Sequence, residues 1–389
     1  MTILAATCWP QVPPEQLRTV ARAAEDSGLG ELWLWEDCFW GGAMSLASAL
    51  LAWTDRLRVA IGVLPVPLRN VALTAMETAM LHRLFPGRVT VGVGHGVQSW
   101  MGQVGARAES PVTLLGEYLQ ALRGLLRGER LTVDGRYVKL DGVALDWPPL
   151  TPPPVLAAAA GPRTLRLSGQ FADGTILDSA GTADRLREAR RAIDAGRDAA
   201  GRADAHTVVL YLLTVTGPDA ARRLEAMARP GTAAVAGDAH AVAEAVRAWT
   251  AAGADKVVLH PGPDDQDPVA FVRFAAEQVQ PLLALRGEPA PRVRAVAGAR
   301  LGGLGPLAVR GGEPVVHQRH DRGDERCHQG AGDELGDEAA PALWQGEQDR
   351  RQRDVDEDHD DPHDDQRAEH VPPVAADRPP APAERVERA

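Results

Sequence analysis

Two short segments of the sequence hold side chains that could handle protons. Asp37 lies among large apolar neighbours, where a carboxylate needs a polar or charged partner to stay ionised. His95 lies between two glycines, and an imidazole titrates near neutral pH. We therefore expect Asp37 and His95 to orient or protonate a substrate; a loop carboxylate and an ordinary loop histidine are the alternatives. Cys38 and Trp40 are the candidate substrate contacts, unless Trp40 only covers the neighbouring core.

Two glycine-containing segments are candidates to contact a flat ligand ring. In Ile61-Gly62-Val63, a glycine near the end of an apolar run allows a bulge or close approach of a ring, although packing also explains such a glycine. The second segment is Gly94-His95-Gly96, in which His95 could also meet a polar cofactor edge. Val97 stands where a dinucleotide fingerprint needs its third glycine, which argues against a nicotinamide Rossmann site.

A third segment favours a phosphate group. Ala159, Ala160 and Gly161 precede Pro162, which is typical of the first position of a helix. Small residues leave the backbone N–H groups of a helix start accessible, and such N–H groups bind anions. Close packing is the alternative explanation.

Other chemistry finds little support in the sequence. It contains no G-x-S-x-G, H-E-x-x-H or P-loop motif, and no metal site is expected. Cys8, Cys38 and Cys327 are too far apart for a disulfide framework or a zinc site. The histidines near the C-terminus lack the spacing of metal ligands. Apolar walls, glycines and a phosphate-type loop suit a bound aromatic cofactor better than a hydrolytic centre.

The elements that must position these residues alternate between short β-type runs and helical stretches. The predicted strands are 2–7, 31–35, 57–63, 88–93, 154–158, 174–177, 207–214 and 256–260. The predicted helices are 14–27, 43–53, 71–84, 111–127, 162–171, 182–200, 238–252 and 268–285. Eight strand–helix units predict an α/β fold, a (β/α)₈ TIM barrel with an insertion, in which residues after the strands build the site. Residues 130–147 contain Asp134-Gly135 and predict an inserted hairpin. A doubly wound open sheet is the main alternative.

Composition divides the chain near residue 287. Residues 1–286 are predicted to form the barrel domain, whereas beyond Pro291 there is no Ile, Met, Phe, Tyr or Lys. A segment that cannot bury apolar surface cannot offset its conformational entropy, so 287–389 is expected to be a disordered tail. Because it is so rich in Arg, Ala, Gly, Pro and Asp, out-of-frame translation of GC-rich DNA is a further hypothesis. Resequencing the gene's end would test it.

Charge and hydropathy limit the partners and the compartment. The net charge of −11 comes without a basic stripe, which argues against nucleic-acid binding. Met1–Pro10 has no Lys or Arg, and no window reaches the roughly 18 apolar residues of a membrane span. We expect a cytoplasmic protein that acts on a small molecule without a membrane partner, with a homodimer as its candidate assembly.

Several motifs, taken in order, resemble the bacterial luciferase-like flavin-dependent oxidoreductases, and more narrowly their branch that uses the deazaflavin coenzyme F-420. They are Trp33–Asp37, Gly62–Pro65, Leu84–Gly96 and Ala159–Gly169. The resemblance covers about residues 1–286. It implies a barrel with a flavin-type ring at its mouth, a carboxylate at Asp37 near the reactive face, and a non-prolyl cis peptide within Ile61–Val63. It also implies that Ala160 and Gly161 lie at the phosphate loop.

Two departures qualify this resemblance. Cys38 and Val97 occupy positions where members that oxidise alcohols or sugar phosphates often have His and Glu, so those acid–base roles do not transfer. Our first hypothesis is hydride transfer between coenzyme F-420 and a small, partly apolar organic substrate. An FMN-dependent monooxygenase on the same barrel is the alternative, and an inactive cofactor-binding barrel is a third.

Overall fold

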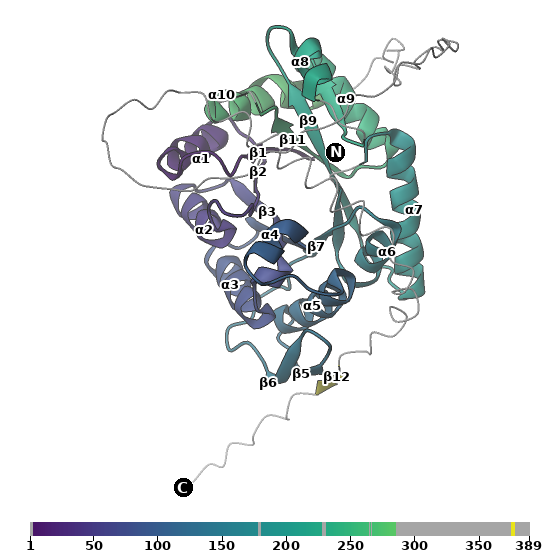
Figure 1. The fold of residues 1–389 in the computed structure, drawn as a ribbon. Coiled ribbons are helices and arrows are strands. Elements are labelled where there is room, and N and C mark those ends of the chain that lie inside the picture. The colour runs from purple at the N-terminus through teal and green to yellow at the C-terminus, as the bar shows by residue number, and fades with distance from the viewer. Residues whose placement is uncertain are drawn as a thin grey trace, which may run out of the picture. The chain divides into compact units, whose positions relative to one another are not determined.

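Parallel strands close into a ring with helices around it (Figure 1). The computed structural model describes residues 3–177, 180–227, 231–263, 265, 267–284 and 375–377. Within them the strand order is β9-β11-β1-β2-β3-β4-β7-β8, and pairing of β8 with β9 closes the ring. The ring strands are β1 (Ile3–Cys8), β2 (Glu31–Leu34), β3 (Arg58–Pro65), β4 (Val89–Gly94), β7 (Val155–Ala158), β8 (Gly174–Leu177), β9 (Thr207–Val215) and β11 (Lys256–Pro261). The predicted barrel is confirmed, and closure excludes the open doubly wound sheet.

Alternate strand residues fill the inside of the barrel, because successive side chains of a strand point to opposite faces. The interior cluster consists of Ala5, Trp33, Ala60, Leu156, Ile176, Val209, Tyr211 and Val258. Near the amino ends of β2 and β11, Lys256 forms a buried ion pair with Glu31, and Trp33 Nε1 donates to Glu31 at 2.7 Å. The opposite strand faces pack against the helices and form the larger core.

The main helices follow the predicted pattern. They are α1 (Leu17–Asp26), α2 (Ala43–Trp53), α3 (Val71–Leu84), α5 (Pro111–Leu126), α6 (Pro162–Phe171), α7 (Ala183–Ala199), α9 (Ala239–Ala252), α10 (Pro268–Arg273) and α11 (Gln280–Ala284). Several begin at a polar side chain that accepts a backbone N–H, as Ser110 does for α5 and Asp238 for α9. None of the described helices is both long enough and apolar enough to cross a membrane.

Two predicted helices differ in detail. The stretch 14–27 begins with a 3₁₀ turn, Pro14–Gln16, before α1. The stretch 268–285 is divided, since a π-helical segment, Phe274–Val279, separates α10 from α11. Sequence periodicity over a few residues does not distinguish these helix types, because all of them place apolar residues three to five positions apart.

The connections hold elements that the sequence did not reveal. They are α4 (Gln98–Gln103), a 3₁₀ turn at Val66–Leu68, α8 (Ala220–Met227) and β10 (Ala234–Ala236), which pairs with β9 outside the ring. Each is too short to show a helical or alternating period. The predicted hairpin is confirmed as β5 (Arg130–Asp134) and β6 (Lys139–Val143), although β6 starts later than expected.

The predicted tail lies almost entirely outside the described residues, as do Cys327 and the C-terminal histidines. Only β12 (Ala375–Asp377) is described there, and it pairs with β5. All of the described residues, β12 included, belong to one compact unit.

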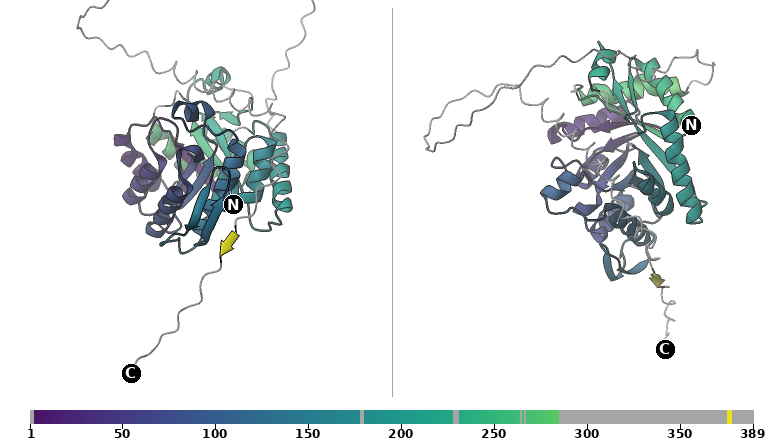
Figure 2. Two further views of the ribbon diagram at one scale, coloured as in Figure 1. Left: turned by 60° about the horizontal axis from the view of Figure 1, so that its bottom comes forward. Right: turned by 45° about the vertical axis from the view of Figure 1, so that its right-hand side comes forward.

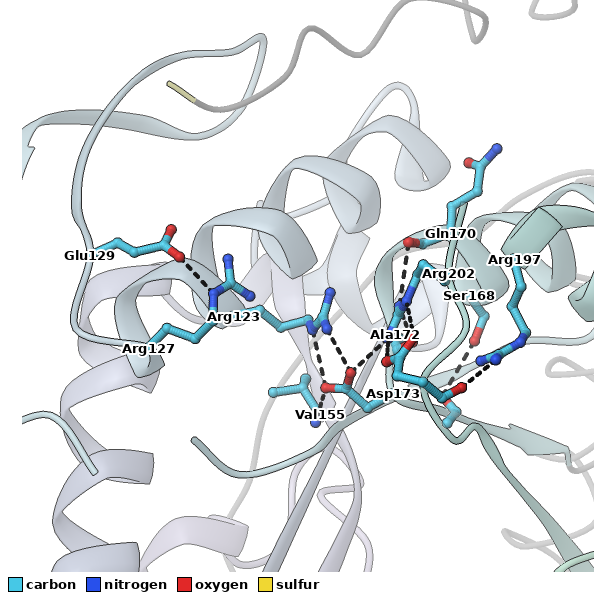
Figure 3. A network of polar contacts seen from close by, with 12 residues as sticks. Arg123, Arg127, Glu129, Val155, Ser168, Gln170, Ala172, Asp173, Arg197 and Arg202 are labelled. Atoms are coloured by element: carbon cyan, nitrogen blue, oxygen red, sulfur yellow. Dashed lines mark hydrogen bonds and ion pairs between the residues drawn. The ribbon is translucent and has the colours of Figure 1, made fainter. Parts of the chain in front are cut away.

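A polar network holds the amino ends of β7 and β8 (Figure 3). The Asp173 carboxylate accepts from Arg123 of α5 at 2.6 Å, from Arg202 at 2.8 Å and from the Val155 backbone N–H at 2.9 Å. In a barrel this end serves stability, whereas chemistry occurs at the carboxyl ends.

Candidate functional site

The predicted site residues lie near the carboxyl ends of four strands that are neighbours in the ring, β2, β3, β4 and β7, or directly after them. Since all ring strands are parallel, their carboxyl ends lie on one face of the barrel. Figures 1 and 2 show α4 close to this group of strands. The fold therefore places the segments around Asp37, Gly62, His95 and Ala160 on one face.

The segment that carries Asp37 is held by an ion pair. Both carboxylate oxygens of Glu36 accept from Arg69, at 3.0 Å each, and one of them also accepts the Ala43 N–H at 2.7 Å. Arg69 bonds to Glu77 of α3 as well, at 2.7 Å. Burial alone would lower the pKa of Arg69, but these carboxylates raise it. Asp37, the next residue, is half-buried on a segment with a fixed backbone.

The segments after β2 and β4 pack against each other. Buried Cys38 contacts Trp100 and Met101 of α4, with Val97 against the same cluster. A cis peptide bond joins Cys38 to Phe39. Cys38 thus lies in one buried cluster with residues of α4, a helix that the sequence analysis did not predict.

Gln98 supports the segment around His95. Its side chain is buried, and its amide nitrogen donates to the backbone carbonyls of His95 and Gly96 at 3.3 Å each. Gly96 has a φ of +69°, and a Cβ there would lie 2.9 Å from Pro65. The sequence analysis did not identify Gln98, Glu36 or Arg69 as site residues. The available signal for Glu36 and Gln98 was their position next to the segments that carry Asp37 and His95, whereas Arg69 had no such signal.

The end of β3 departs from a regular strand. The register with β4 shifts between Ile61 and Leu64, and the peptide bond between Gly62 and Val63 is cis. This is the position where the family resemblance implies a cis peptide. A Cβ on Gly94 would lie 2.9 Å from Val63 Cγ2 and 3.2 Å from Ala158 Cβ. Ile61–Val63, Gly94 and the end of β7 are thus in direct contact.

The fifth barrel strand leads straight into a helix start. The Ala159 N–H donates to Ile176 of β8 at 3.1 Å, Ala160 is exposed, and Gly161 precedes α6. No side chain caps this helix. Because the first N–H groups of a helix have no intrahelical partner, this end is suited to an anion.

Trp40 lies apart from these contacts. Its side chain is 57% exposed, and that of Phe39 is 61% exposed. The roles predicted for Trp40 and Cys38 in contacting a substrate remain predictions.

The sequence is similar to a known protein family and to individual enzymes. Residues 3–255 match the profile of a family described as luciferase-like monooxygenase. A 5,10-methylenetetrahydromethanopterin reductase from Methanolobus tindarius is 30% identical over 193 residues, which are 50% of this chain and 59% of that protein. An F-420-dependent glucose-6-phosphate dehydrogenase from Kineococcus radiotolerans is 30% identical over 208 residues, or 50% of this chain and 61% of that protein. The chain thus spans about three fifths of these relatives.

Solved structures share the fold. The coenzyme F-420-dependent tetrahydromethanopterin reductase of Methanopyrus kandleri superposes with a TM-score of 0.63 at 18% identity, covering 72% of this chain and 99% of that one. An F-420-dependent secondary alcohol dehydrogenase gives 0.65 at 20% identity, with the same coverage of both chains. A monooxygenase from Streptomyces bottropensis gives 0.61 at 17% identity, again covering 72% and 99%.

Proposed function

The chain belongs to the luciferase-like monooxygenase family, and from that premise we propose that it is an oxidoreductase that binds the deazaflavin coenzyme F-420. In this proposal it moves a hydride between the coenzyme and a small organic substrate. The relatives whose names include coenzyme F-420 support this choice of cofactor.

The observation that carries the proposal is the surface shared by β3, β4 and β7. Ile61, Gly62 and Val63 would support one side of the ring, and the segment Gly94–Gly96 would meet its edge. A Cβ on Gly94 would lie 2.9 Å from Val63, so this glycine lets β4 pack closely against β3 and keeps Val63 in place beside it. A flat ring fits such a surface.

The second part of the cofactor site is the start of α6. Ala160 and Gly161, which follow Ala159, would receive the phosphate of the cofactor's chain, because backbone N–H groups at a helix start favour negative charge. The absence of a capping side chain on α6 agrees with this assignment.

When bound, the coenzyme would supply the hydride chemistry, because its ring carries carbon where a flavin carries nitrogen. Asp37 and His95 would orient the substrate and hold the proton that accompanies hydride transfer. Cys38 and Trp40 would contact the substrate; buried Cys38 would also keep water from the space behind Asp37. We further propose a cytoplasmic enzyme with no nucleic-acid or membrane partner and a homodimeric assembly.

An FMN-dependent monooxygenase is the second candidate. The Streptomyces bottropensis monooxygenase superposes nearly as well as the F-420-dependent enzymes do. Cys38 and Val97 also depart from members that oxidise alcohols or sugar phosphates. Both cofactors have a flat ring and a phosphate-bearing chain, so the surface described above suits either.

Fluorescence titration of the full chain with coenzyme F-420 and with FMN tests the proposal, with Asp37→Ala alongside. We expect tighter binding of coenzyme F-420, and loss of turnover in Asp37→Ala. Tighter binding of FMN, with oxygen-dependent turnover, would favour the monooxygenase. Binding without turnover of any substrate would favour the inactive barrel.

A further inference from the structure

Tyr211 spans the interior of the barrel from β9 to β3. In the ring, three strands separate β9 from β3 in either direction, so the two lie on opposite walls. The Tyr211 hydroxyl nevertheless donates a hydrogen bond of 2.9 Å to the Gly62 carbonyl. This bond ties the irregular end of β3 to the far wall.

The surroundings hold the tyrosine ring in one place. Tyr211 is buried and meets the ring of Trp33 edge-on at 5.8 Å between centroids, and that of Trp35 at 5.4 Å. His260 lies on a third side at 6.3 Å. Such edge-to-face contacts favour a single ring orientation. In this mostly apolar interior a hydrogen bond is stronger than in water, and its loss leaves a buried carbonyl without that donor.

Gly62 and Tyr211 fit each other as a pair. A Cβ on residue 62 would lie 2.4 Å from the Tyr211 hydroxyl and 2.6 Å from the Trp33 ring. Only glycine leaves room for the hydroxyl to reach the carbonyl. The bond also lies within the register shift between Ile61 and Leu64, where regular pairing with β4 does not fix the backbone.

We propose that Tyr211 is a positioning residue, which sets the orientation of the Gly62–Val63 peptide plane and thereby of the surface offered to the cofactor ring. This inference rests on the proposed function, since it assigns a role within the same site. Because the hydrogen bond orders the peptide plane before the cofactor binds, binding does not have to lose conformational entropy at this place. The Tyr211 hydroxyl therefore contributes to cofactor affinity without touching the cofactor ring.

Tyr211→Phe in the full chain tests the proposal, and Tyr118→Phe is its matched control. The Tyr118 hydroxyl is also buried and donates to Thr74 Oγ1 at 2.7 Å, but between α5 and α3. We expect Tyr211→Phe to raise the Kd of the bound coenzyme about tenfold and to shift its absorption spectrum. Tyr118→Phe should leave both unchanged, although each variant loses one buried hydrogen bond and some stability.

The outcomes separate this inference from the proposed function. If the wild-type chain binds neither coenzyme F-420 nor FMN, both fail. If the wild type binds one of them and Tyr211→Phe binds it with the same Kd and spectrum, only the inference fails. Equal changes in Tyr211→Phe and Tyr118→Phe would also overturn it, because a general loss of stability would then explain the effect.

Should Tyr211→Phe not fold, incorporation of 3-fluorotyrosine keeps the ring and strengthens the hydroxyl as a donor. In a background with both Tyr118→Phe and Tyr137→Phe, Tyr211 is the one tyrosine left in the sequence, and we expect its labelling to shift the absorption of the bound cofactor relative to unlabelled protein. An unchanged spectrum would overturn the proposal.

Discussion

At the scale of single residues, the candidate site depends on groups whose neighbours are fixed before any ligand binds. Asp37 follows Glu36, whose two oxygens are held by Arg69 and by the start of α2. His95 lies on a segment whose carbonyls receive the Gln98 amide. Preorganised groups of this kind lose little entropy when a substrate binds.

Asp37→Asn should lower kcat by about a hundredfold or more, because a positioned carboxylate typically contributes that much to proton handling. The amide has nearly the same shape, so we expect the protein to stay folded. Steady-state kinetics with the cofactor identified by titration measures the effect. Asp26→Asn, on the exposed side of α1, is the control; equal kcat values for the two variants would remove Asp37 from the mechanism.

Three histidines should make the protein sensitive to acid. Burial lowers the pKa of His82, His206 and His260 to about 4. Nearby Arg197 adds to the effect at His206, whereas the Pro261 carbonyl opposes it at His260. An unfolded chain has imidazole pKa values near about 6.5.

Between these values the unfolded state binds more protons than the folded state, so the free energy of unfolding rises with pH. Stability should be complete above about pH 6.5 and should fall by about 1–2 kcal/mol per histidine by about pH 5. Urea unfolding at a series of pH values measures this. His82→Gln should reduce the pH dependence of the free energy of unfolding by about one third. An unchanged pH dependence in this variant would contradict the lowered pKa of His82.

At the scale of elements, buried carboxylates join helices to neighbouring backbone. Glu25 of α1 accepts the N–H groups of Asp55, Arg56 and Leu57 through one oxygen, at 2.6–3.1 Å. Burial opposes ionisation of Glu25, yet these bonds lower its pKa overall. Glu117 of α5 likewise accepts N–H groups of residues 136–138 and so fixes the inserted hairpin.

Glu25→Ala should lower the free energy of unfolding by about 2–3 kcal/mol, because it leaves three N–H groups, including that of buried Leu57, without their acceptor. Glu15→Ala, at an exposed position before α1, should change it by less than about 0.5 kcal/mol. Denaturant unfolding compares them, and a similar small loss in both would show that water replaces the carboxylate.

Arg69→Lys should lower kcat about tenfold, because a lysine ammonium cannot bond both Glu36 oxygens and Glu77 at once. The affected element is the connection from β2 to α2, which carries Asp37. Arg187→Lys replaces the arginine of an exposed ion pair with Asp184 and should leave kcat unchanged. If Arg69→Lys keeps full activity, the pair serves stability alone.

At the scale of the whole molecule, the two ends of the barrel divide their tasks. The ion pairs of Arg123 with Asp173 and of Lys256 with Glu31 lie at the amino ends of the strands. The candidate site lies at the carboxyl ends. Consequently, variants at Asp173 should affect folding, whereas variants around Asp37 should affect chemistry.

A chain that ends at Arg286 should keep cofactor affinity and a single cooperative unfolding transition. Its described part contains the closed ring and its core, and loses only the short pairing of β12 with β5. Calorimetry and cofactor titration against the full chain measure this. A large loss of affinity would contradict our proposal that 287–389 is not needed for the site.

The sequence by itself determined the barrel of alternating strands and helices, and it supplied the candidate site segments. It could do so because the signals are local. They are the alternation of residues within strands, proline at helix starts such as that of α6, and glycine at the ends of α1 and α9. Asp37, His95 and Ala160 were predicted by their places after strands, and Gly62 by its place near the end of one. Short elements such as α4 were not predicted, since a helix of six residues is too short to show a helical period of apolar residues.

Only the tertiary structure decided which of these residues meet and what holds them. Closure of the ring brings Tyr211 to Gly62, 149 positions earlier in the chain. Cys38 lies in one buried cluster with Met101, and Arg69 pairs with Glu36, because neighbouring strands bring the segments that follow them together. Such contacts depend on how strands and helices pack in space; they leave no pattern in the sequence, because the partners are distant and each residue alone is compatible with many neighbours.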